Sequence, residues 1–124
     1  MSVRVAVIGV GALGRHHARI LAGLPGAELV GVVDINEPRA REIGGLVNAH
    51  ASANATELLG RVDAVTVAVP TESHLKVAMP FLQHGTAVLV EKPLARDAGE
   101  AQQMIAAAAA SGAVADATTT GPWP

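Results

Sequence analysis

An apolar run that opens directly onto three glycines constrains the fold of this chain more than any other feature. Residues Val3 to Ile8 are mostly β-branched or apolar, which predicts a strand buried on both faces of a parallel sheet. Glycines follow at Gly9, Gly11 and Gly14, and apolar residues then recur at helical spacing until Pro25-Gly26. A strand, a tight turn and a helix in this order predict the start of a βαβ unit.

The rest of the chain repeats this alternation of strands and helices. Alternation of this kind predicts an α/β fold, a Rossmann-type doubly wound parallel sheet with helices on both faces. Further strands are expected at Ala27–Asp34, Val62–Pro70 and Thr86–Glu91, with a short edge strand left open within 46–53. Helical segments are expected at Glu37–Ile43 (ended by Gly44-Gly45), at Ala55–Leu59, at 72–85 (kinked or divided by Pro80), and after the capping pair Asp97 and Glu100.

Residues 1–112 are therefore expected to form one domain. A chain of 124 residues has the usual length for a single domain. The last segment, 113–124, reads AVADATTTGPWP and has no sustained apolar period. It contains three consecutive threonines and two prolines, so a disordered tail is the expectation there.

The glycine spacing G-x-G-x-x-G, in its setting between a strand and a helix, predicts a dinucleotide-binding turn. Gly9 permits the tight turn, Gly11 lets a pyrophosphate approach the backbone, and Gly14 lets the helix pack against the strand. Ala12 and Leu13 complete the turn where the helix N-terminus offers free N–H groups to phosphates. A glycine-rich turn without a ligand is the alternative.

Asp34 stands 20 residues beyond Gly14 (34 − 14), at the end of the second expected strand. A carboxylate at this point accepts hydrogen bonds from the adenosine ribose hydroxyls and repels a 2′-phosphate, which favours NAD and makes NADP the less favoured cofactor. Arg39 and Arg41 follow and could accommodate a phosphate, and a plain turn or N-cap role is the other interpretation of Asp34. A methyltransferase loop would carry an acidic residue where Ile8 stands, and no Gly-Lys-Ser/Thr run of a P-loop is present.

Composition excludes several other classes of function. A formal net charge of −2 and only two aromatic residues, Phe81 and Trp123, argue against nucleic acid as a partner. No apolar run reaches the length of about 18 residues that spans a membrane. The chain has no cysteine, which fits a cytoplasmic location, and no histidine pair has metal-ligand spacing, so no metal is expected. The apolar N-terminus also fits a signal peptide, but the glycine turn favours the strand.

Two further segments, AVPTESH at 68–74 and VLVEKP at 88–93, follow the glycine turn in order. With them the chain resembles the Gfo/Idh/MocA family of NAD(P)-dependent dehydrogenases over residues 3–112. The short GRHHAR segment and AVPTESH are most similar to members that oxidise UDP-N-acetylhexosamines. The resemblance implies a sugar, cyclitol or sugar-nucleotide substrate. It also implies cofactor-binding roles for Pro70, Thr71, His74, Glu91, Lys92 and Pro93 beside Gly9, Gly11, Ala12, Leu13, Gly14 and Asp34.

Lys92 is the one catalytic residue that the resemblance implies. A lysine ammonium beside the reacting hydroxyl stabilises the alkoxide that develops as hydride leaves, and a desolvated lysine can join proton transfer. Without the resemblance, Glu91-Lys92-Pro93 would be interpreted as a strand end with a solvated charge pair.

In the family, this domain continues into one more buried strand, and a second α/β domain follows. The sequence departs from that pattern after Gly112, so both are expected to be missing from this chain. The second domain supplies most substrate contacts and the oligomer interface in the family, so a truncation, a frameshift or an isolated domain is suspected. Three hypotheses follow: the cofactor half of a sugar-type dehydrogenase, a non-catalytic NAD-binding module, or an inactive remnant.

Overall fold

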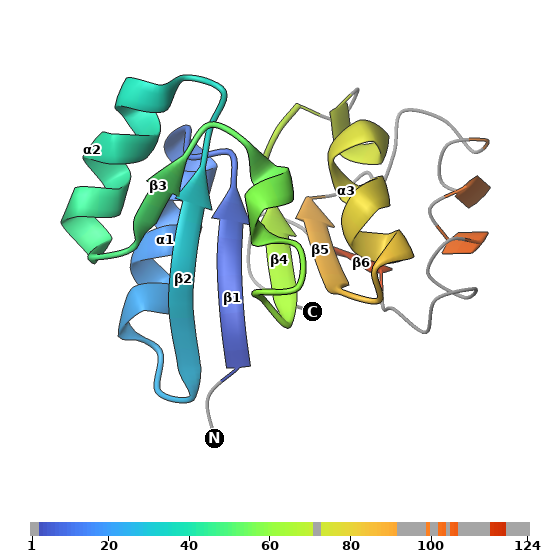
Figure 1. The fold of residues 1–124 in the computed structure, drawn as a ribbon, viewed down its shortest axis with the longest axis horizontal. Coiled ribbons are helices and arrows are strands. Elements are labelled where there is room, and N and C mark those ends of the chain that lie inside the picture. Colours follow the sequence, from blue (N-terminus) through green and yellow to red (C-terminus); the bar gives the residue numbers. More distant parts are fainter. Residues whose placement is uncertain are drawn as a thin grey trace.

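A computed structural model of the chain describes residues 3–70, 73–91, 99, 102–103, 105–106 and 115–118. Within these residues the strands form one sheet in the order β3-β2-β1-β4-β5-β6, and every neighbouring pair is parallel (Figure 1). This order is that of a doubly wound dinucleotide-binding sheet, as the alternating pattern predicted. The elements are β1 (Val3–Ile8), α1 (Ala12–Gly23), β2 (Ala27–Val33), α2 (Glu37–Val47), β3 (His50–Ser52), η1 (Ala55–Leu58), β4 (Ala64–Val67), α3 (His74–Gln83), β5 (Ala87–Glu91) and β6 (Ala115–Thr118).

Two apolar clusters cover the two faces of the sheet. Because side chains alternate along a strand, Ala6 and Ile8 of β1 join one cluster, which contains Phe81 of α3. Val7 joins the other cluster, which contains Ile43 of α2 and residues of α1. Figure 1 shows α1 behind the sheet and α3 in front of it. The prediction of helices on both faces is therefore confirmed.

Helix α2 is longer than the sequence pattern predicted. It passes through Gly44 and Gly45 and ends at Val47, with Asn48 as a C-cap in the left-handed conformation (φ 57°, ψ 47°). Gly44 is buried, and a Cβ atom there would lie 2.8 Å from the carbonyl oxygen of Ala49 and 3.1 Å from the side chain of Ala51. Gly44 thus allows close packing of α2 on the sheet, and the prediction that the two glycines end the helix is wrong.

The other boundaries differ by smaller amounts. β4 covers only Ala64–Val67 of the expected Val62–Pro70, and the short edge strand left open in 46–53 is β3. Helix α3 contains Pro80 but is not divided by it. Asp97 and Glu100, the expected capping pair, lie outside the described residues, although 99, 102–103 and 105–106 are helical.

The strand β6 corrects the expectation for the end of the chain. Residues 113–124 were expected to be a disordered tail, but Ala115–Thr118 pair with β5 from Val88 to Glu91. The segment has no apolar run to signal a strand, and the unpaired backbone edge of β5 supplies its hydrogen-bond partners. The family's further strand, expected to be missing after Gly112, therefore has a counterpart in the sheet.

The central strands β1 and β4 are neighbours, although β2 and β3 intervene in the sequence. From β1 the chain winds outward on one side through β2 and β3, and on the other through β4, β5 and β6. Ligands of open parallel sheets bind outside the carboxyl ends of the strands at such a switch point. That edge is where β1 runs into the glycine turn.

Candidate cofactor site

The glycine turn connects β1 to α1 and packs tightly on the neighbouring strands. Gly9 has a φ of 92°, which L side chains rarely adopt, and its N–H donates to the carbonyl of Val33 over 2.6 Å. A Cβ atom at Gly9 would lie 2.8 Å from the carbonyl oxygen of Ala68, just beyond β4. The position requires glycine for its conformation and for its contacts.

Gly14 and Gly11 serve different purposes. A Cβ atom at Gly14 would lie 1.7 Å from the carbonyl oxygen of Gly9, so no other residue fits between the turn and α1. Gly11 has ordinary dihedral angles (φ −66°, ψ −159°), and nothing lies within 4 Å of a Cβ atom built there. The absence of a side chain at Gly11 therefore leaves open space at the start of a helix.

Helix α1 begins at Ala12 with Gly11 as its N-cap. A glycine cap has no side-chain acceptor for the N–H groups of the first turn, and α1 has no acidic residue in that turn. These donors and the positive end of the helix dipole face the carboxyl edge of the sheet, where they favour a bound anion. The turn has the form that a pyrophosphate requires.

Asp34 lies directly after β2 and is bound to the glycine turn. Its Oδ2 atom accepts a hydrogen bond of 2.9 Å from the N–H of Val10, and its Oδ1 atom accepts one of 2.9 Å from the N–H of Asn36. The sequence predicted Asp34 at this edge but did not predict these backbone donors. Each carboxylate oxygen retains a lone pair for a further donor such as a ribose hydroxyl.

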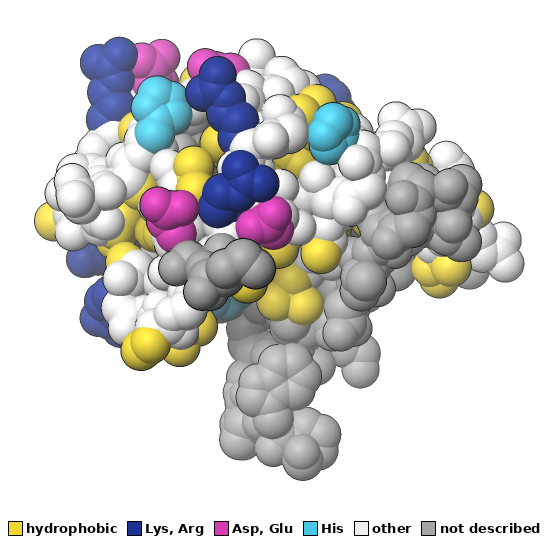
Figure 2. All heavy atoms as spheres, turned by 60° about the horizontal axis from the view of Figure 1, so that its bottom comes forward, with side chains coloured by type: hydrophobic (Ala, Val, Ile, Leu, Met, Phe, Trp, Pro, Cys, Tyr) yellow, Lys and Arg dark blue, Asp and Glu magenta, His cyan; other side chains and the backbone are white. Residues whose placement is uncertain are grey.

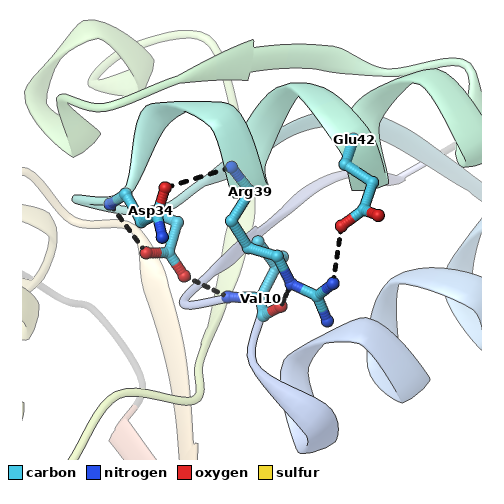
Figure 3. Close-up of polar contacts among 5 residues, drawn as sticks. Val10, Asp34, Arg39 and Glu42 are labelled. Carbon is cyan, nitrogen blue, oxygen red and sulfur yellow. Dashed lines mark hydrogen bonds and ion pairs between the residues drawn. The ribbon is translucent and has the colours of Figure 1, made fainter.

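Arg39, from the first turn of α2, binds the same residue of the turn as Asp34 (Figure 3). Its Nε–H donates to the carbonyl oxygen of Val10 over 2.8 Å, and its Nη1 lies 2.7 Å from Oε1 of Glu42. Arg41 instead forms an exposed ion pair with Glu37 on α2. Both arginines that could accommodate a phosphate thus have acidic partners within the chain.

The segment after β4 forms the opposite wall of this edge. The Cγ1 atom of Val69 would lie 2.9 Å from a Cβ atom at Gly9, and the carbonyl of Pro70 accepts from the N–H of Ser73 over 2.9 Å. His74 is buried at the start of α3 with Nε2 3.0 Å from the carbonyl oxygen of Val69. A carbonyl only accepts hydrogen bonds, so Nε2 of His74 is the protonated ring nitrogen.

The remaining predicted site residues are less completely described. Glu91 is the last residue of β5, and the register of β4 with β5 places it at the same edge as the glycine turn. Thr71, Lys92 and Pro93 lie outside the described residues, and so do the side chains of Ala12 and Leu13. The structure therefore brings Gly9, Gly11, Gly14, Asp34, Pro70, His74 and the backbone of Glu91 to one edge of the sheet.

Ile35 is a candidate site residue that the sequence pattern missed. It stands between Asp34 and the α2 cap Asn36, and it is 96% exposed. The sequence did offer one signal: a large apolar residue stands directly after the acidic residue, in an expected loop. Such a residue gains nothing from exposure to water, so a contact with a ligand would explain it. Val10 and Arg39 were missed as partners because they are 29 residues apart in sequence.

The described side chains give two further findings. No group of three or more His, Asp or Glu residues is arranged to hold a metal ion in the part of the chain that the structure describes. None of the described helices is long and apolar enough to cross a membrane. On the face shown in Figure 2, several Lys and Arg side chains lie beside Asp or Glu side chains instead of gathering into one basic patch.

Comparison with known proteins identifies the family. The sequence model of the Gfo/Idh/MocA oxidoreductase family, described as an NAD-binding Rossmann fold, matches residues 3–118. The chain belongs to the Gfo/Idh/MocA family. The resemblance stated from the glycine turn and the two downstream segments is therefore confirmed, and the match includes β6.

Individual members of the Gfo/Idh/MocA family are similar over most of this chain. UDP-N-acetylglucosamine 3-dehydrogenase of Acidithiobacillus ferrooxidans is 41% identical over 103 residues, which cover 83% of this chain and 32% of that protein. Inositol 2-dehydrogenase 3 of Saccharopolyspora erythraea is 36% identical, covering 90% of this chain and 34% of that protein. The chain spans about a third of the length of these curated relatives.

Solved structures of the family have the same fold. A structure of GenD2 from gentamicin A biosynthesis in complex with NAD is 34% identical and superposes with a TM-score of 0.87, covering 94% of this chain and 34% of that one. A structure of the Acidithiobacillus ferrooxidans enzyme GnnA superposes with a TM-score of 0.86, covering 93% of this chain and 38% of that one. The described domain is thus the NAD-binding Rossmann domain of this oxidoreductase family.

Proposed function

We propose that this chain binds NAD along the turn between β1 and α1, and that it serves the oxidation of a CH–OH group in a sugar, cyclitol or sugar nucleotide. The proposal rests on two glycines of the turn, one needed for packing within the fold and the other leaving room for a ligand. Gly14 is required by the fold, because a Cβ atom would meet the Gly9 carbonyl at 1.7 Å. Gly11 leaves open space at an uncapped helix N-terminus, which suits the close approach of a pyrophosphate.

Different residues of the site would bind different parts of the cofactor. The N–H groups of Gly11, Ala12 and Leu13 would bind the pyrophosphate, and the remaining lone pairs of Asp34 would accept from the adenosine ribose hydroxyls. The charge of Asp34 and the ion-paired state of Arg39 and Arg41 favour NAD over NADP. Ile35, exposed beside Asp34, would cover one face of the adenine ring.

The nicotinamide half would lie against the segments after β4 and β5. Pro70, Thr71 and the buried His74 would shape this wall, since His74 binds the carbonyl of Val69. When bound, NAD supplies the acceptor for a hydride. Lys92, within Glu91-Lys92-Pro93, would hold the substrate hydroxyl and stabilise the alkoxide charge that develops on it.

The relatives guide the choice of substrate. A UDP-N-acetylglucosamine 3-dehydrogenase is 41% identical to this chain, and an inositol 2-dehydrogenase is 36% identical. UDP-N-acetylglucosamine and inositol are therefore the first two substrates to test. A cytoplasmic location, and an oligomer interface located beyond this chain, stay predictions.

A non-catalytic NAD-binding module is the second candidate. It is favoured by the family match itself, because the matched model over residues 3–118 is described as an NAD-binding Rossmann fold. Both candidates require NAD to bind, and they differ in whether Lys92 is used.

One experiment tests both candidates. The purified chain is titrated with NAD and then incubated with NAD and each substrate, while NADH formation is followed by absorbance. The dehydrogenase proposal predicts saturable binding, and NADH formation that Lys92→Met abolishes while the exposed α3 variant Lys76→Met retains it. Binding without NADH formation would favour the module, and the absence of saturable NAD binding would overturn both.

A further inference from the structure

Asp34 and Arg39 bind the two backbone polar groups of Val10 in the glycine turn: Asp34 accepts from its N–H, and Arg39 donates to its carbonyl oxygen. We propose that Arg39 is a positioning residue: it fixes the Val10–Gly11 peptide so that the turn is preformed for pyrophosphate, and it does not itself bind the cofactor. The inference rests on the proposed NAD-binding function. It assigns a role to a residue that the cofactor pattern had left as a possible phosphate ligand.

The contacts around Val10 form a closed ring of hydrogen bonds (Figure 3). The N–H of Val10 donates to Asp34 over 2.9 Å, and the N–H of Asn36 donates to the other oxygen of Asp34 over 2.9 Å. The backbone N–H of Arg39 donates to Oδ1 of Asn36 over 3.3 Å. The side-chain Nε–H of Arg39 donates to the carbonyl of Val10 over 2.8 Å, which closes the ring. The start of α2 and the glycine turn are therefore held as one unit.

Peptide geometry explains why the carbonyl of Val10 matters for a ligand. The carbonyl of Val10 and the N–H of Gly11 belong to one planar peptide unit, and in a trans peptide they point in opposite directions. Arg39 holds the carbonyl on the side of α2, so the N–H of Gly11 is directed to the other side. Loss of the Arg39 contact would free this peptide to rotate, and a phosphate would then have to order it on binding.

The surroundings of Arg39 fit positioning better than phosphate binding. Its side chain is only 29% exposed, and Glu42 accepts from its Nη1 over 2.7 Å, which fixes the guanidinium and offsets its charge. Arg41, two residues later, is 73% exposed and pairs with Glu37 away from Val10. Arg41 thus provides a matched control with the same charge on the same helix.

The test compares Arg39→Met, which keeps an unbranched stem but removes the donor, with Arg41→Met. Arg39→Met is expected to weaken NAD and NADP by the same factor, about tenfold, the size of one charge-assisted hydrogen bond. Arg41→Met is expected to leave NAD affinity within about twofold of the wild type. Weakening of NADP alone would mean that Arg39 binds the 2′-phosphate directly, and unchanged NAD affinity would mean that the contact is dispensable; either result overturns the proposal.

A readout without cofactor separates this proposal from the proposed function. Amide hydrogen exchange at Val10 and Asn36, whose N–H groups both donate to Asp34, is expected to be faster in Arg39→Met than in the wild type and Arg41→Met. If the wild type fails to bind NAD, the proposed function fails, and the exchange rates still decide whether Arg39 fixes the turn. If Arg39→Met does not fold, Glu42→Gln is used, and it is expected to shift exchange in the same direction by a smaller factor. Exchange equal to that of the wild type in the folded variant would overturn the proposal.

Discussion

The carboxylate of Asp34 accepts a hydrogen bond from the backbone N–H of Val10, with Oδ2 and N separated by 2.9 Å. The acidic residue after β2 is therefore part of the glycine turn before any cofactor binds. Since its other oxygen accepts from the N–H of Asn36, the same carboxylate also fixes the start of α2. In the proposed complex one side chain would connect the ribose site to the pyrophosphate site.

Replacing Asp34 tests this double role. Asp34→Asn keeps one oxygen acceptor but loses the charge and the second acceptor, so NAD affinity is expected to fall by about tenfold or more. NADP affinity is expected to fall less, because the carboxylate no longer repels the 2′-phosphate. Isothermal titration calorimetry with both cofactors measures the change. Asp63→Asn, at the opposite end of the sheet, is the matched control, and equal losses for NAD and NADP would restrict Asp34 to its contacts within the turn.

Gly14 tests the packing of the turn independently of the ligand. In Gly14→Ala the new Cβ atom would overlap the backbone carbonyl of Gly9, at a separation of 1.7 Å, and neither backbone segment can move freely. The free energy of unfolding is expected to fall by about 3 kcal/mol or more, as in severe overpacking. Urea unfolding measures it, with Gly23→Ala as a control because nothing lies within 4 Å of a Cβ atom there. Wild-type stability of Gly14→Ala would contradict the described turn.

Replacing Ile35 is expected to change NAD affinity without changing the stability of the fold. Because the side chain is 96% exposed, Ile35→Ala is expected to leave the free energy of unfolding within about 0.5 kcal/mol of the wild type. NAD affinity is expected to fall about three- to tenfold if the side chain covers adenine, in proportion to the apolar surface removed. Titrations with NAD and with AMP check this, since both carry adenine. A loss for neither ligand would remove Ile35 from the site.

The ion pair between Arg4 and Asp63 predicts a dependence of stability on pH. The N–H of Arg4 and its guanidinium both donate to the carboxylate, which holds the pKa of Asp63 below its ordinary value of 3.8. A lowered pKa stabilises the folded chain above the unfolded pKa, and this contribution is lost as the pH falls through the folded pKa. The stability difference between wild type and Asp63→Asn is therefore expected to be present at neutral pH and to shrink below pH 3.8.

Urea unfolding at a series of pH values measures this difference. Glu37→Gln is the control, since Glu37 pairs with Arg41 in an exposed ion pair on α2. A difference between wild type and Asp63→Asn that stays constant across the acid range would contradict the role of the Arg4 contacts.

Much of the fold could be predicted because its signals are local. The apolar run of β1, the glycine turn and the residues that follow identify a dinucleotide-binding unit within about 30 residues of sequence. The misses have tertiary causes. Gly44 is a packing glycine inside α2, and β6 is a strand because β5 offers a free edge, although Ala115–Thr118 lacks an apolar pattern.

The site was predictable only where spacing carries information. The distance from Gly14 to Asp34 predicted the acidic residue, but no spacing rule relates Arg39 to the carbonyl of Val10. That contact depends on how α2 leaves β2, which Asn36 fixes by capping the helix. Such contacts arise from the folded arrangement of elements, so sequence periodicity gives no sign of them.

Binding of NAD to the glycine turn is tested most directly by titrating the wild type and Gly11→Ala side by side. A Cβ atom at Gly11 meets nothing within 4 Å, so Gly11→Ala is expected to unfold at the same urea concentration as the wild type. The methyl group would occupy the space proposed for the pyrophosphate, and NAD affinity is expected to fall by about a hundredfold, on the order of an overpacking cost of 3 kcal/mol. Equal NAD affinity in the two folded proteins would contradict binding at this turn.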